Sequence, residues 1–166
     1  GEAWARLAYA HWLAEERAEA REAAEEALQS FRQVGDSRGE AGVLCDSAEA
    51  LLKLGRCSQA LQHAMQALDL CASASSPCDR EQVQALSLAS QAHLANGQAD
   101  KALDLVEEKV AVMRRSMQLN RLAFAESLNV LTQVTLVAAG VLGLRSLGNK
   151  ALACAQEAVA LTRGVR

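Results

Sequence analysis

The sequence predicts an all-α protein built as a solenoid of stacked helical hairpins, and three observations carry this prediction. Helix-favouring Ala, Leu, Glu and Gln dominate the chain, whereas aromatic residues make up only 3% of it and proline occurs once. A pattern of small and apolar residues recurs three times in one frame. Glycines fall at matching places in two of the three copies. Because 51% of the residues are hydrophobic, we expect one soluble domain with a substantial core.

The repeat is defined by eight positions that share a preference for Ala, Leu and other small or apolar residues. In the first copy these are Trp4, Leu7, Ala8, His11, Ala20, Ala24, Ala27 and Leu28. The second copy has Leu44, Ser47, Ala48, Leu51, Ala60, Ala64, Ala67 and Leu68. The third has Leu86, Ala89, Ser90, His93, Ala102, Val106, Lys109 and Val110. Small residues at these positions let the two helices of a hairpin approach closely.

The joints between helices fit the same frame. Gly55 and Gly97 sit where the two helices of a repeat are joined, and a left-handed backbone there costs glycine little. Residues 35–40 and 76–79 are typical of helix starts, with a capping Ser followed three residues later by an acid. The sequence therefore predicts a single domain over 1–166, with repeats at about 1–34, 37–72, 77–113 and 117–166.

The last repeat departs from the frame because its first helix is predicted to be elongated, over roughly 117–144. No residue from Ser127 to Leu144 is charged, and this segment borders on the length of a membrane span. A helix packed between neighbours in a solenoid is also apolar nearly all round, so burial in protein is the favoured interpretation. Membrane association or an oligomeric contact stays as the alternative, and direct insertion is not expected.

The cysteine content favours a cytoplasmic protein. The five cysteines form no C-x-x-C pair, so free thiols are expected, with a loop-closing disulfide between Cys71 and Cys78 as the alternative.

Acidic residues outnumber basic ones over 1–108 and the reverse holds over 109–166. Solvated helix faces explain this, as would head-to-tail stacking or a basic patch for an acidic partner. The chain begins at Gly1 within a helical pattern, so we expect a fragment of a longer protein.

No catalytic, metal or cofactor site is predicted. His11 and His93 occupy equivalent positions two repeats apart, His63 lies on a second helix, and none is expected to have an acidic partner. Phosphate-binding loops, nucleophile elbows and metal-ligand helices are missing from the sequence. Nucleic-acid binding is not expected either, because the basic last third contains a single aromatic residue, Phe124.

The three-fold frame resembles the tetratricopeptide repeat family, in the 40–42-residue variety found in kinesin light chains and in the sensor arms of bacterial signal-transduction ATPases. The junction 31–41 is particularly similar to the latter. The resemblance covers residues 1–112 and implies a right-handed superhelix whose first helices line a concave, partner-binding face. The positions implied are Tyr9, Trp12, Leu13, Cys45, Glu49, Leu52, Lys53, Ser87, Gln91 and Leu94.

The resemblance implies a non-catalytic scaffold that binds a protein or peptide partner. Tyr9 and Trp12 are the expected anchors, although Trp12 could equally be part of a terminal cap. The positions that other members use to clamp acidic carboxyl tails lack the needed Lys and Asn, so an apolar or basic segment is expected. Two alternatives remain: a structural subunit docked through its end faces and the 127–144 helix, and the regulatory sensor arm of a multidomain ATPase or transcription regulator.

Overall fold

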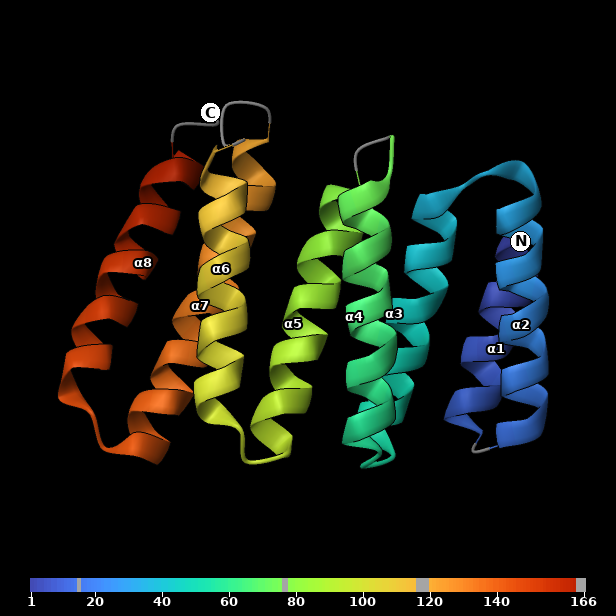
Figure 1. The fold of residues 1–166 in the computed structure, drawn as a ribbon, viewed down its shortest axis with the longest axis horizontal. Coiled ribbons are helices and arrows are strands. Elements are labelled where there is room, and N and C mark those ends of the chain that lie inside the picture. Colours follow the sequence, from blue (N-terminus) through green and yellow to red (C-terminus); the bar gives the residue numbers. More distant parts are fainter. Residues whose placement is uncertain (15, 76–77, 116–119, 164–166) are drawn as a thin grey trace. The chain divides into compact units, whose positions relative to one another are not determined.

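The computed structural model describes residues 1–14, 16–75, 78–115 and 120–163, apart from the side chains of Leu13 and Arg17. Within these ranges the chain forms eight α-helices and no strand (Figure 1). The prediction of an all-α helical repeat is confirmed. The chain divides into two compact units, Gly1–Ala92 and His93–Arg166, and each is described by itself.

The first unit holds two complete hairpins and most of a fifth helix. Helices α1 (Glu2–Leu13) and α2 (Arg17–Val34) form the first hairpin, and α3 (Ser37–Lys53) and α4 (Cys57–Ser73) form the second. Helix α3 also packs against α1 and α2. Helix α5 (Asp79–Ala95) begins in this unit, and the boundary falls after Ala92.

Small side chains of the repeat frame are buried in the helix packing, as predicted. Ala8 is 3% exposed, and Ala48 of α3 and Ala60 and Ala64 of α4 have no exposed surface. Alanine loses almost no side-chain entropy on burial and keeps neighbouring helix axes close. Phe31, at the end of α2, packs against the same core as Ala8 and Val43.

The turns between helices also follow the prediction for glycine. Gly55 and Gly97 both have φ of +71°. In each of these turns two amides return to the helix just completed: Gly55 N donates to Leu52 O at 3.0 Å, and Arg56 N to Leu51 O at 2.8 Å. This pair of bonds satisfies carbonyls that the end of a helix would otherwise leave open.

The start of α3 differs from the prediction in its capping residue. Asp36, not Ser37, is the cap: its Oδ1 accepts a hydrogen bond from Gly39 N at 2.9 Å, and Ser37 is the first residue of the helix. A carboxylate is favoured there because the first turn of a helix presents free N–H groups and partial positive charge. Residues 76 and 77 of the other predicted start lie outside the described residues.

The second unit contains α6 (Ala99–Arg115), α7 (Arg121–Leu142) and α8 (Arg145–Arg163). Helix α7 has 22 residues, against 17 in α3 and α5, and packs against both α6 and α8. Phe124 and Leu128 of α7 are almost fully buried. The predicted helix starts earlier, at about 117, but residues 117–119 lie outside the described part of the chain.

Helix α7 is long and apolar enough to cross a membrane by length and composition alone, as its uncharged sequence suggested. In the structure 56% of the apolar window is buried inside the protein. The rest faces outward, and Leu136, Val137 and Val141 are 55%, 47% and 67% exposed. The expectation that protein covers this helix therefore holds for about half of its apolar window.

Candidate partner-binding groove

A groove runs between α3 and α5 in the first unit. It encloses about 340 Å³ and is lined by Glu49, Leu52, Lys53, Gln84, Ser87, Leu88 and Gln91. The α5 residues recur three or four positions apart, so they lie on one face of that helix. Three of the seven side chains are amides or hydroxyls, two are leucines, and Glu49 and Lys53 carry opposite charges. The groove can therefore offer hydrogen bonds and an apolar contact to the same ligand.

Lys53 organises the charge at the edge of this groove. Its Nζ lies 2.8 Å from Glu49 Oε1, donates to Tyr9 Oη at 3.3 Å, and sits 5.7 Å from the centre of the Tyr9 ring. The hydrogen bonds to Glu49 and Tyr9 raise the pKa of Lys53. Burial, and then the nearby Glu49, raise the pKa of Asp46. The groove thus carries one ion pair, and Asp46, on the same helix but outside the groove lining, has a disfavoured charged form.

Contacts near the start of α5 hold it against α3. Arg38 Nε donates to Glu81 Oε1 at 3.0 Å, and the Glu81 side chain is only 12% exposed. Cys45 Sγ donates to the carbonyl oxygen of Glu81 at 3.7 Å. These contacts fix the spacing of the two helices, and with it the width of the groove.

A comparison with known protein families finds a match for the first two hairpins. The family model of the tetratricopeptide repeat matches residues 1–73, which span α1 to α4. Residues 1–73 are tetratricopeptide repeats. No curated protein matches the chain significantly. The described hairpin α7–α8 lies outside the matched segment and continues the same pattern of paired helices.

Five of the residues implied by the resemblance, Glu49, Leu52, Lys53, Ser87 and Gln91, line the groove between the first helices of successive repeats. Tyr9 does not line the groove, but its hydroxyl accepts a hydrogen bond from Lys53, which does. The side chain of Leu13 lies outside the described residues, and Leu94 is half-buried in the second unit. For these two, the role stays a prediction.

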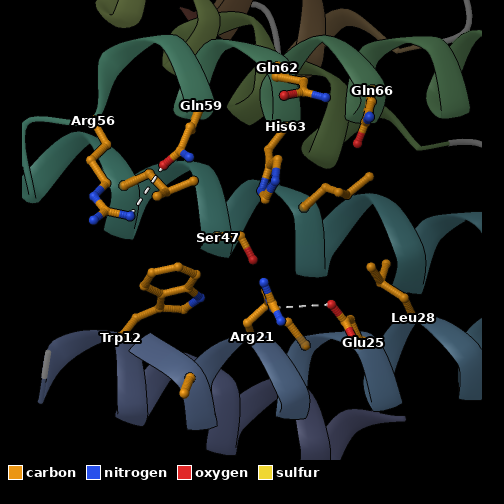
Figure 2. A pocket seen from close by; sticks show the side chains of 14 residues that line it. Trp12, Arg21, Glu25, Leu28, Ser47, Arg56, Gln59, Gln62, His63 and Gln66 are labelled. Atoms are coloured by element: carbon orange, nitrogen blue, oxygen red, sulfur yellow. Dashed lines mark hydrogen bonds and ion pairs between the residues drawn. The ribbon is translucent and has the colours of Figure 1, made fainter. Parts of the chain in front are cut away.

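Two expected groove residues are placed elsewhere. Cys45 has no exposed surface and its thiol donates to the backbone carbonyl of Glu81 on α5, so it cannot contact a partner in this structure. Burial raises the pKa of its thiol, which is therefore neutral. Trp12 is 8% exposed and lines a different cavity, between α2, α3 and α4 (Figure 2). Trp12 therefore does not line the α3–α5 groove, and its role as a partner anchor stays a prediction.

Gln84 and Leu88 line the groove but were not among the implied positions. A signal for them was present in the sequence. Gln84 lies three residues before Ser87 and Leu88 three residues before Gln91, so each shares a helix face with an implied position. The repeat frame identified the helix that faces the groove but included too few of the positions on that face.

The histidines also differ from expectation, although they form no metal site. His11 does have an acidic partner: its Nδ1 lies 2.6 Å from Glu16 Oε2, across the α1–α2 turn. His93 makes the equivalent contact to Gln98, at 2.9 Å. Both side chains therefore brace turns of the repeat. Among the described residues, no group of three or more His, Cys, Asp or Glu could hold a metal ion.

Proposed function

We propose that this chain is a non-catalytic interaction module that binds a peptide segment of a partner protein in the groove between α3 and α5. Tetratricopeptide repeats generally mediate protein–protein interactions and are typically not enzymes, and residues 1–73 carry such repeats. The observation that carries the proposal is the groove itself, in which Leu52 and Leu88 lie among the amide side chains of Gln84 and Gln91.

The chemistry of the groove favours an extended peptide. A glutamine amide both donates and accepts hydrogen bonds, as a peptide main chain does, so Gln84 and Gln91 can pair with backbone groups whatever the sequence of the ligand. Gln91 Nε2 already donates to Ser87 Oγ at 3.0 Å, which orients its carbonyl oxygen. Leu52 and Leu88 then offer an apolar contact for one side chain of the peptide.

Charge favours an apolar or basic peptide over an acidic one. The single cation lining the groove, Lys53, is paired with Glu49, and Asp46 lies on the same helix nearby. An acidic peptide would meet Glu49 without gaining an unpaired cation. A basic side chain could instead take the place of Lys53 beside Glu49.

The test begins with a displayed library of twelve-residue peptides, from which a ligand is selected on the wild-type chain. Its affinity is then measured by calorimetry for the Gln84→Ala/Gln91→Ala double variant and for Gln29→Ala, an exposed glutamine on α2. Loss of two hydrogen-bonding groups at about 0.5–1.5 kcal/mol each should weaken binding by roughly tenfold. Equal affinity for the double variant and the wild type would show that the peptide binds elsewhere.

A second candidate role, that of a structural subunit, is favoured by the exposed apolar side chains of the second unit. Besides Val137 and Val141 on α7, Leu152 and Val159 on α8 are 59% and 46% exposed. Apolar side chains that gather on one exposed surface are typical of a protein–protein contact. If these side chains dock the chain into an assembly, Val137→Arg/Val141→Arg should abolish co-purification of the assembly, and Gln84→Ala/Gln91→Ala should not.

A further inference from the structure

A cavity separate from the α3–α5 groove lies within the first unit. It encloses about 560 Å³, which is in the range of small-molecule sites, roughly 300–1,000 Å³. Figure 2 shows Arg21, Glu25 and Leu28 of α2 on one side, α4 side chains such as His63 on the other, and Ser47 of α3 between them. Trp12, from the last turn of α1, closes one end.

Two buried polar atoms of this cavity have no hydrogen-bond partner. They are Trp12 Nε1 and His63 Nδ1. Buried polar groups are nearly always paired, since burial without a partner costs the lost hydration of the group. An indole N–H can only donate, so what is missing at Trp12 is an acceptor. Both atoms are covered by their neighbours, so a ligand in the cavity supplies the missing partners only after a small rotation of the two rings.

Charge and hydrogen-bonding capacity indicate the class of ligand. Arg21 and Arg56 line the cavity, and their nearest partners are distant: Arg21 Nε lies 3.4 Å from Glu25 Oε1, and Arg56 Nη1 lies 3.4 Å from Gln59 Oε1. Both guanidiniums can therefore turn to a new acceptor at little cost. With two cations against one acid, and a buried N–H donor, the cavity is suited to an anion.

The remaining walls are apolar. Leu28 of α2 and Leu44 and Leu51 of α3 line the same cavity. Burial lowers the pKa of His63, so near neutral pH its ring is uncharged and carries one N–H donor. The ring thus adds a hydrogen bond without adding a third positive charge. A ligand that fits has an apolar body and one anionic, hydrogen-bond-accepting head.

We propose that this cavity binds a small amphipathic carboxylate, such as a medium-chain fatty acid or an acylated metabolite. The carboxylate accepts hydrogen bonds from Arg21 or Arg56 and, once the indole has turned, from Trp12 Nε1, and the apolar body packs against the leucines. In the view of Figure 2 the indole nitrogen faces the side on which Arg21 lies. This site is independent of the α3–α5 groove, so either can fail without affecting the other.

The probe is decanoate, below its micellar concentration, with decanol and decylammonium as controls that keep the apolar chain and change the head group. The chain carries Trp4→Phe, because Trp4 is 43% exposed and its removal leaves one indole N–H signal, from Trp12, in a proton–nitrogen NMR spectrum. Decanoate should shift that signal saturably and bind at least about tenfold more tightly than either control. Absence of a saturable shift, or equal binding of all three probes, would overturn the proposal.

Variants separate a specific site from general attraction to positive charge. Arg21→Gln/Arg56→Gln should weaken decanoate binding about tenfold or more, while Lys101→Gln, an exposed lysine of the second unit, should leave it unchanged. Equal weakening by both would refute the site. Circular dichroism of each variant shows whether it is folded, and the head-group comparison on the parent chain needs no variant of the cavity.

A further arm distinguishes a free carboxylate from the carboxyl terminus of a protein. A five-residue peptide ending in leucine is titrated beside its carboxyl-terminal amide. If the peptide acid binds and decanoate does not, the ligand is the carboxyl terminus of a protein and the proposal of a small molecule is wrong. Binding of decanoate, with the peptide acid weaker, supports it.

Discussion

The substitution Ala60→Leu tests the close helix contact on which the repeat frame depends. Ala60 has no exposed surface, and Ala48 of α3 and Ala64 of α4 are equally buried. Leucine adds three carbon atoms to the alanine methyl. If the site had room, burying them would stabilise the fold by about 2 kcal/mol, at roughly 0.8 kcal/mol for each carbon. In a filled site the same atoms force neighbouring side chains and helices apart.

Because the small residues pack with no exposed surface, we expect the second outcome, a loss of about 1–3 kcal/mol. For a chain of this size, 2 kcal/mol corresponds to a fall in Tm of about 4–8 °C. The matched control is Ala72→Leu, on the exposed side near the end of the same helix, which should change stability by less than about 0.5 kcal/mol. Thermal unfolding followed by circular dichroism measures both. An unchanged or raised Tm for Ala60→Leu would refute the close contact.

The remaining predictions concern side-chain burial, capping and turn geometry. Phe124→Ala should cost about 3–5 kcal/mol, because Phe124 is 1% exposed, whereas Leu122→Ala, at a 55% exposed position, should cost little. Asp36→Ala removes the cap of α3 and should cost about 1 kcal/mol in urea unfolding. Gly143→Ala should destabilise by about 1–2 kcal/mol, because φ there is +67°, whereas Gly140→Ala, inside α7, should stabilise by about 0.5–1 kcal/mol. Equal effects of the two glycine changes would contradict the α7 boundary.

The fold was largely predictable because its determinants are local and repeated. Alanines such as Ala48 and Ala60 mark the helix contacts, and Gly55 and Gly97 mark the turns, and both kinds of residue act over only a few positions of chain. The cap of α3 shows the limit of such reasoning. Asp36 and Ser37 are both good capping residues, and only the register of the first turn decides between them.

The site was less predictable because it depends on how one repeat packs on the next. Cys45 precedes Glu49 by four residues on the same side of α3, yet Cys45 is fully buried, with its thiol bonded to Glu81 of the following repeat, while Glu49 lines the groove. Trp12 follows Tyr9 by three residues, yet it enters the cavity beside α2 and α4. Helical spacing gives the side of a helix but does not show which neighbour covers that side.

The pairing of His11 with Glu16 escaped prediction for a related reason. The two residues are five positions apart and lie on opposite sides of a turn, so they do not share a helix face. Only the closed turn brings the ring and the carboxylate together. The repeated contact of His93 with Gln98 shows that the geometry belongs to the turn, whether the partner is charged or neutral.

Mapping a selected peptide on the chain by NMR tests the central claim most directly. In this experiment the nitrogen-labelled chain is titrated with the peptide, and shifts are followed at the side-chain amides of Gln84 and Gln91, with Gln29 and Gln133 as exposed references. If the α3–α5 groove is the binding surface, the first pair should shift saturably with the peptide and the references should not move. Shifts confined to α7 and α8, with Gln84 and Gln91 unchanged, would contradict the account and favour a docking surface on the second unit.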